Sequence, residues 1–175
     1  MKVSNLPLLL FLFVLFACNS ESKKVIPTAE KTVVQYFSDT LKQDTFKVAL
    51  KGKDSKDMSL LFTIINYKGV QIYKEEIKAT ILLKSYLASE DLKKENDKIK
   101  FLNDEANFFF EEEHFLIPAI TPDEKPDHNI PDLAFYEELK QSNLNGFNYS
   151  LGKDKQIYIA WSAKEQKVKI YYKCC

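Results

Sequence analysis

Three stretches near the end of the chain alternate large apolar residues with polar or smaller ones, and this pattern constrains the fold most strongly. The large members are Phe147, Tyr149 and Leu151, then Ile157, Ile159 and Trp161, and finally Val168, Ile170 and Tyr172. Side chains two positions apart on a strand point to the same face, so each set predicts a strand with one buried face. Turn residues at 152–154 and 163–166 separate the stretches, which predicts a three-stranded antiparallel meander with Trp161 buried.

A second group of strand-like stretches lies in the first half of the chain. Residues 46–50 alternate apolar side chains with lysine, residues 58–65 form a denser apolar run, and residues 70–73 continue after a turn. The polar segments at 52–57 and 66–69 contain Gly, Asp and Asn, which favour turns. We therefore expect a second three-stranded antiparallel meander.

Between the two meanders the apolar residues recur at helical spacing. The clearest stripe comprises Leu92, Ile99, Leu102, Ala106, Phe109 and Phe110. We predict helices at 92–112 and 132–142, further helical turns at 28–41 and after Ile77, and a loop at 121–131, which holds three prolines. The expected fold class is α+β: one antiparallel sheet built from the two meanders, with helices packed on one face.

The charge composition excludes one broad class of partner. The chain has 25 basic and 25 acidic residues, and every basic residue is a lysine. A nucleic-acid-binding domain needs a basic surface, and arginine is the residue that grips phosphates and guanine edges through two hydrogen bonds. We therefore expect no nucleic-acid partner. With 13 Phe and 9 Tyr, the chain has ample apolar surface for a folded core.

The start of the chain has the layout of a signal peptide. Lys2 gives a positive start, residues 6–16 are almost entirely apolar, and the small residue Ala17 comes directly before Cys18. The apolar run is shorter than the roughly 20 residues that a membrane-spanning helix needs. This pattern favours a segment that is removed during export.

The sequence Leu15-Phe16-Ala17-Cys18 resembles the lipobox of bacterial lipoproteins. The resemblance implies that the Cys18 thiol receives a diacylglyceryl group and becomes the first residue of the mature protein. It divides the chain into a signal peptide at 1–17, a flexible tether at 18–28 and a single globular domain at 29–175. The alternative is an ordinary signal peptide cut near Ala17, which leaves a free cysteine.

The same resemblance predicts where the protein is anchored. Acyl chains embedded in the lipid bilayer hold a protein at the membrane persistently. Asn19 follows the cysteine, as in lipoproteins of the outer membrane, so we expect a cell-envelope protein facing the periplasm. Exposure at the cell surface stays open, because residues 19–24 carry only a weak version of the acidic export signal of the Bacteroidota.

Few residues suggest catalysis or metal binding. His114, His128 and Asp127 can be drawn as a metal site, but they lack the ordered ligand spacing of zinc proteins, so we expect no metal and no cofactor. No nucleophile motif or Gly-rich phosphate loop is present. Paired carboxylates of a glycoside hydrolase remain open, because their separation in space cannot be read from a sequence.

Two further features concern covalent modification. Cys174 and Cys175 are adjacent, and their Cα atoms must lie about 3.8 Å apart, closer than in ordinary disulfides. The open readings are a strained vicinal disulfide, free or mixed thiols, an intermolecular disulfide and a soft-metal site. Asp39-Thr40-Leu41 resembles the O-glycosylation motif of exported Bacteroidota proteins, which makes Thr40 a candidate acceptor. The N-glycan sequon at 148–150 lies in a predicted strand and carries no expectation.

These observations favour a membrane-anchored binding module over an enzyme. The expected partners are the lipid bilayer, through Cys18, and a protein, which makes an immunity-type inhibitor or a scaffold the leading function. A tethered periplasmic hydrolase that uses carboxylates is the first alternative. A structural assembly factor of the outer membrane is the second.

Overall fold

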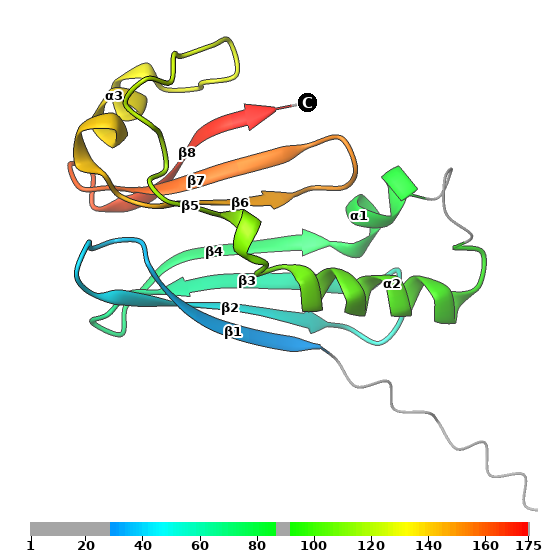
Figure 1. The fold of residues 1–175 in the computed structure, drawn as a ribbon. Coiled ribbons are helices and arrows are strands. Elements are labelled where there is room, and N and C mark those ends of the chain that lie inside the picture. The colour runs from blue at the N-terminus through cyan, green and yellow to red at the C-terminus, as the bar shows by residue number, and fades with distance from the viewer. Residues whose placement is uncertain (1–28, 87–91, 175) are drawn as a thin grey trace, which may run out of the picture.

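The computed structural model describes residues 29–86 and 92–174. Within these ranges the chain forms two four-stranded antiparallel sheets that lie one above the other (Figure 1). Sheet A contains β1 (Glu30–Tyr36), β2 (Gln43–Lys51), β3 (Ser59–Ile65) and β4 (Gln71–Lys78). Sheet B contains β5 (Phe115–Leu116), β6 (Gly146–Ser150), β7 (Gln156–Ser162) and β8 (Lys167–Cys174). In both sheets, neighbours in sequence are neighbours in space.

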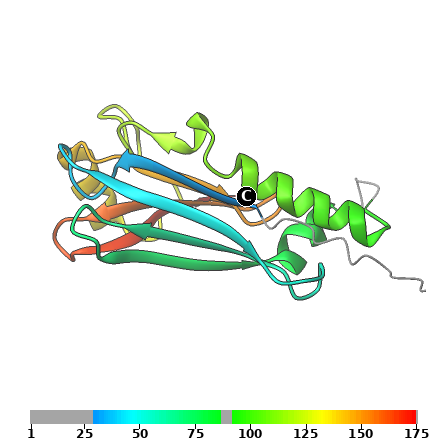
Figure 2. The ribbon, with the colours of Figure 1, turned by 90° about the horizontal axis from the view of Figure 1, so that it is seen from below.

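Three α-helices and one 3-10 turn accompany the sheets in the described part of the chain. They are α1 (Ala79–Tyr86), α2 (Glu95–Phe108), the turn η1 (Glu112–His114) and α3 (Leu133–Ser142). Figure 2 shows α2 beside the end of sheet A where β1 begins. None of these helices is long and apolar enough to cross a membrane. The predicted signal peptide at 1–17 and the tether at 18–28 lie outside the described residues.

The expected α+β class with antiparallel sheets is confirmed, but three details of the prediction were wrong. The six predicted strands are present, yet each sheet has four strands rather than three. The added strands are β5 and β1, and β1 occupies the segment for which we expected helical turns. The meanders form two facing sheets rather than one, so the helices do not share one face. Two sheets that each have one apolar face bury these faces most fully when they pack against each other.

Phenylalanine dominates the core between the sheets. Phe46 and Phe62 of sheet A are fully buried, and their rings lie 5.4 and 5.2 Å from the ring of Phe147 in sheet B, measured between centroids. Phe109 and Phe110, which follow α2, pack on Phe62 as well. Burial of such rings is the main source of stability for a domain of this size.

Helix α2 contributes Ile99, Leu102 and Ala106 to this core and is also joined to sheet A by hydrogen bonds. The backbone N–H of Ala29, just before β1, donates to Oδ1 of Asn103 at 3.1 Å. Leu102 is fully buried. The predicted helix at 92–112 is therefore present with narrower bounds, and its apolar stripe faces the core as expected.

The outer face of sheet B is covered by α3 and by the loop that precedes it (Figure 1). Phe135, Tyr136 and Leu139 of α3 are buried against Ala160 and Tyr171 of the sheet. The Asp132 side chain accepts a hydrogen bond from the N–H of Phe135, as expected of a residue that caps a helix N-terminus. The helix therefore creates a second apolar cluster, separate from the core between the sheets.

A β-bulge in β8 corrects one predicted face. Ile159 pairs with Ile170, whereas the adjacent Tyr158 pairs with Tyr172, so Tyr171 is an extra residue in β8. A bulge of this kind turns the following side chains to the opposite side of the sheet. The spacing predicted that Tyr172 shares the inner face with Ile170. Because of the bulge, Tyr172 instead lies on the outer face beneath the loop.

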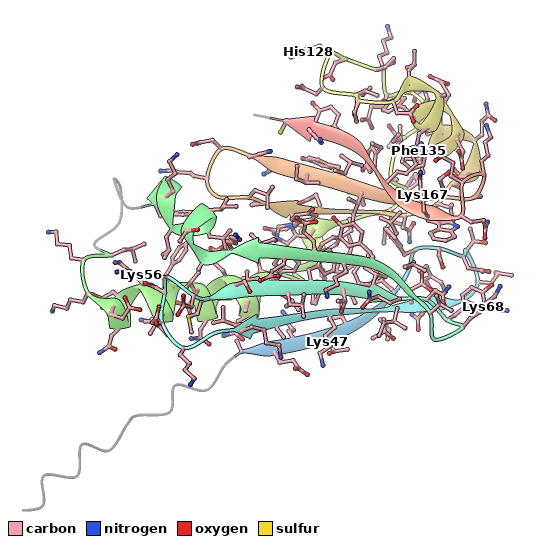
Figure 3. The ribbon with its side chains drawn as sticks, turned by 180° about the vertical axis from the view of Figure 1, so that it is seen from behind. Lys47, Lys56, Lys68, His128, Phe135 and Lys167 are labelled. Atoms are coloured by element: carbon pink, nitrogen blue, oxygen red, sulfur yellow. The ribbon has the colours of Figure 1, made fainter. Side chains whose placement is uncertain are left out.

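Trp161 is buried, as predicted, with 8% of its surface exposed, and it belongs to the core between the sheets. The outer face of sheet A is different, because its side chains point toward solvent. Figure 3 shows Lys47 on this face, on the opposite side of the molecule from Phe135 and His128. Lys47 pairs with Glu30 at 2.7 Å, and both side chains are largely exposed.

Candidate functional site

A cavity of about 410 Å³ lies on the outer face of sheet B, between the strands, α3 and the loop at 117–132. Its walls are rich in tyrosine, and we call it the tyrosine cavity. The lining residues are Leu116, Ala119, Glu124, Lys125, Asp127, Ile130, Tyr136, Tyr158, Tyr171 and Tyr172. Ligand sites are commonly apolar concavities with a few polar groups, within a range of roughly 300–1,000 Å³.

The bulge in β8 builds this cavity. Because Tyr171 is an extra residue, both it and Tyr172 lie on the side of α3, next to Tyr158 of β7. The ring of Tyr158 is nearly perpendicular to that of Tyr172, at 86° and 5.2 Å between centroids. A regular strand would have placed one of the two β8 tyrosines on the inner face. The aromatic wall therefore depends on the bulge.

Tyr171 is held in place from the floor of the cavity. Its hydroxyl donates to the carbonyl oxygen of Ala119 at 3.0 Å. A Cβ atom on Gly146 would lie 2.8 Å from that hydroxyl and 3.0 Å from Cβ of Ala119, so only glycine leaves room for this approach. Tyr171 is 3% exposed, and its burial raises the pKa of its phenol. Tyr171 is thus a fixed wall with a satisfied hydroxyl.

Tyr172 ties the loop to the sheet. Its hydroxyl donates to Oδ2 of Asp127 at 3.0 Å and accepts from Nδ2 of Asn129 at 3.1 Å. Asp127 also accepts a hydrogen bond from the N–H of Asn129 at 2.8 Å. This bond is the main cause that lowers the pKa of the Asp127 carboxyl, and the bond from Tyr172 lowers it further. In β8, the N–H of Lys173 donates to the carbonyl oxygen of Asn129. The loop at 121–131 is therefore anchored over the cavity.

Tyr136 is the exception among the tyrosines of this cavity. It is 1% exposed, and its buried hydroxyl has no hydrogen-bond partner among the described residues. The pKa of the Tyr136 phenol is raised to about 12, first by burial and then by the charges of Glu124 and Glu137, and the approach of its hydroxyl to the Glu124 carboxylate adds to the rise. The two groups do not meet in full hydrogen-bond geometry. Nearly all buried hydroxyls in proteins are paired, so this one marks a place where a partner is missing.

A second, smaller cavity of about 170 Å³ lies next to α2 and η1. Its lining includes Glu105, Glu111, His114 and Ser150. The pKa of Glu105 is raised, first by burial and then by the neighbouring charge of Asp104. A carboxyl with a raised pKa beside a histidine in a cleft is a pattern typical of acid–base sites.

The structure separates the residues that we considered for metal binding. His114 lines the smaller cavity, and its Nδ1 lies 2.8 Å from Oδ1 of Asn148. His128 is exposed in the loop, and only Asp127 lines the tyrosine cavity. Across residues 29–86 and 92–174, no group of three or more His, Cys, Asp or Glu side chains is placed to hold a metal ion.

The candidate modification sites are only partly described. Thr40 is exposed in the loop between β1 and β2, where Oδ1 of Asp39 accepts from the N–H of Leu41 at 2.7 Å. Cys174 is half-buried at the end of β8, while Cys175 and Cys18 lie outside the described residues. Asn148 of the sequon is buried in β6. The structure thus leaves the acylation and disulfide expectations as predictions.

The tyrosine cavity was missed at the sequence level. The spacing of Tyr172 predicted that it lies on the buried inner face with Val168 and Ile170. Two signals were present: Tyr158 stands between the inward-facing residues of β7, and the doublet Tyr171-Tyr172 interrupts the alternation of β8. Comparison of the chain with protein-family models, curated proteins and solved structures found no significant match.

Proposed function

We propose that this chain is a membrane-anchored binding protein of the bacterial cell envelope that recognises a protein partner through the tyrosine cavity. The observation that carries the proposal is the cavity itself. It joins several aromatic walls with a buried hydroxyl, that of Tyr136, for which the described residues supply no partner. Tyrosine is enriched at interaction hot spots because one ring offers both apolar area and a hydrogen-bonding group.

The anchor in this proposal is Cys18, acylated as the lipobox resemblance implies. Ten residues, 19–28, then connect it to Ala29, and an extended chain of that length reaches at most roughly 35 Å. Helix α3, which contributes Tyr136 to the cavity lining, lies at the opposite end and in the opposite layer from the start of β1 (Figure 1). A domain tethered through β1 would present the cavity away from the membrane, where a partner can reach it. Asn19 favours the periplasmic face of the outer membrane.

Capture of a partner from a detergent extract tests the proposal when matched variants are compared. Tyr172→Ala removes one wall of the cavity, so we expect it to lose most of the partner that the wild-type chain retains. Tyr67→Ala is the control, because Tyr67 is a partly exposed tyrosine in the turn between β3 and β4, away from the cavity. Equal capture by wild type and Tyr172→Ala, with both folded, would contradict the proposal. A partner that is a toxin or hydrolase would support the immunity-type role.

Acylation is tested separately. The full chain should partition into detergent and incorporate a fatty-acid probe, and Cys18→Ala should abolish both properties. Equal labelling of Cys18→Ala would show that the lipoprotein interpretation is wrong. This result would not bear on the cavity, because Cys18 lies outside the described domain.

A second candidate function is a tethered hydrolase, and the smaller cavity favours it. Glu105 has a raised pKa and shares that cavity with Glu111 and His114, which could act as acid and base on a glycosidic or ester bond. Glu105→Gln should abolish such an activity while leaving the fold intact. An activity that survives this change would have to come from another site.

A further inference from the structure

We propose that the tyrosine cavity binds an alkylammonium group, held by the aromatic walls of Tyr158 and Tyr172 and by the carboxylate of Glu124. This inference rests on the proposed function, because it names the chemistry that the binding site accepts. It is carried by three features of the cavity: the arrangement of its rings, the uncommitted carboxylate at its rim and the buried hydroxyl of Tyr136.

The rings of the cavity lie nearly perpendicular to one another. Tyr158 lies at 86° to Tyr172 and at 72° to Tyr171, with centroids 5.2 and 6.0 Å away. Rings at right angles form adjacent walls, and the face of an aromatic ring attracts cations through its quadrupole. The same region already shows this preference, because Nζ of Lys169 lies 4.9 Å from the centroid of Phe135 under α3.

The Glu124 carboxylate is available to such a cation. Oε2 of Glu124 accepts a long hydrogen bond, 3.5 Å, from the N–H of Thr121, and the Tyr136 hydroxyl is close enough for Glu124 to shift its pKa. Lys140 contacts the backbone carbonyl of Glu124, not its carboxylate. A carboxylate without a basic partner beside an apolar wall favours the binding of a positive group.

The cavity lining carries two carboxylates, those of Glu124 and Asp127, and one basic side chain, that of Lys125. After burial, the charge of Glu124 is the next cause that raises the pKa of both Tyr136 and Tyr171. The part of these shifts that comes from Glu124 favours a positive charge on a ligand, whereas burial disfavours a charge of either sign. The Tyr136 hydroxyl is covered, so a primary ammonium would have to displace neighbouring atoms to donate a hydrogen bond to it and give this buried group its missing partner.

The test compares n-butylammonium chloride with butan-1-ol, which has almost the same size and no charge. Binding to the full chain in detergent and amine-free buffer is measured by ligand-observed NMR. We expect a dissociation constant on the order of millimolar for n-butylammonium, as is usual for so small a ligand. Butan-1-ol should bind about tenfold more weakly or not at all. Equal binding of the two compounds, or no binding of either, would overturn the proposal.

Two adjacent charge variants give opposite expectations. Glu124→Gln should weaken n-butylammonium binding about tenfold, because the charged acceptor is lost. Lys125→Gln should strengthen it by about threefold, because a like charge near the site is removed. Glu112→Gln, an exposed change on η1 and outside the cavity, should have no effect. Loss of binding in both Glu124→Gln and Lys125→Gln would indicate damage to the loop rather than recognition of charge and would overturn the assignment.

Tyr136→Phe tests the hydroxyl. It should weaken n-butylammonium binding at least threefold with no loss of thermal stability. Unchanged binding would show that the hydroxyl does not contact the ligand. N-acetyl-lysine amide distinguishes the sources of the group. Tighter binding than that of n-butylammonium supports a lysine side chain of a protein partner, and weaker binding supports a free amine.

The two proposals can fail separately. If n-butylammonium does not bind but Tyr172→Ala still loses its partner, the ammonium assignment is wrong and the binding function stands. If n-butylammonium binds and the full chain retains no partner, the ammonium site stands and the protein-binding function is wrong.

Discussion

The two faces of sheet B differ in how they use aromatic residues. Toward sheet A, phenylalanines pack with each other, and the one pair of tyrosine hydroxyls there, from Tyr73 and Tyr149, lie 2.7 Å apart and satisfy each other. Toward α3, tyrosines surround a cavity, and the hydroxyl of Tyr136 has no partner among the described residues. A core that serves only stability fills its space and pairs its polar groups. The outer face leaves a cavity unfilled and the Tyr136 hydroxyl unpaired, which is why we assign function to it.

The largest effect should come from truncation in the inner core. Phe62→Ala should lower the free energy of unfolding by about 3–5 kcal/mol, because a large ring is replaced by a cavity. Phe62 is fully buried and packs against Phe109 and Phe147 at 5.1 and 5.2 Å between centroids. Chemical denaturation measures the loss. Leu133→Ala on α3, at a side chain that is 57% exposed, is the control and should cost far less.

Trp161→Ala should be nearly as costly, at about 3 kcal/mol, since its side chain is buried in the same core. Wild-type protein should show blue-shifted tryptophan fluorescence, because the single tryptophan is shielded from water. Red-shifted emission from the folded protein would instead favour an exposed anchor for a partner. That outcome would extend the binding surface to the inner face and weaken the difference in function between the two faces of sheet B.

The inner tyrosine pair should make stability depend on alkaline pH. Burial raises the pKa of Tyr73 to about 12 and also raises that of Tyr149. An unfolded tyrosine loses its proton near pH 10, so between pH 10 and 12 the folded state holds more protons and stability falls as pH rises. Tyr149→Phe should reduce this slope. It should also cost about 1 kcal/mol at neutral pH, because a buried hydrogen bond is lost.

The smallest effect should come from Tyr136→Phe in the tyrosine cavity. Its hydroxyl makes no hydrogen bond, so we expect a change in unfolding free energy within about 0.5 kcal/mol, or a slight gain. Tyr171→Phe is the matched change in the same cavity and should cost about 1 kcal/mol, since it loses the bond to Ala119. Thermal unfolding compares the two. A large loss for Tyr136→Phe would show that its hydroxyl has a partner and would remove the difference between the faces.

Much of the chain's local structure could be predicted from its residues. The alternation of Ile157, Ile159 and Trp161 identified β7 and its buried face, because strand geometry fixes which side chains share a side. The stripe that includes Ile99 and Leu102 identified α2 and its packed face for the same reason at helical spacing. The expectation that nucleic acid is not a partner rests on composition alone, and the lipobox resemblance needs only residues 15–18.

Residues 28–41 show where local pattern was insufficient. Val33, Val34 and Phe37 fit a helical spacing, but Thr32, Val33 and Val34 are also a β-branched run that suits a strand. Pairing with β2 decides the outcome, from Glu30 opposite Ala49 to Tyr36 opposite Gln43. Such pairing depends on a second segment, so it could not be read from the first.

The tyrosine cavity was decided only by the tertiary structure. Sequence spacing placed Tyr172 with Val168 and Ile170, and a single extra residue in β8 moved it to the other face. The position of a bulge follows from how two strands pair and what covers them, here α3 and the loop at 117–132. The sequence by itself therefore determined most of the elements, most of their apolar faces and the prediction of an anchor at Cys18. Which faces meet, and where a buried hydroxyl is left without a partner, depends on contacts between segments far apart in the chain.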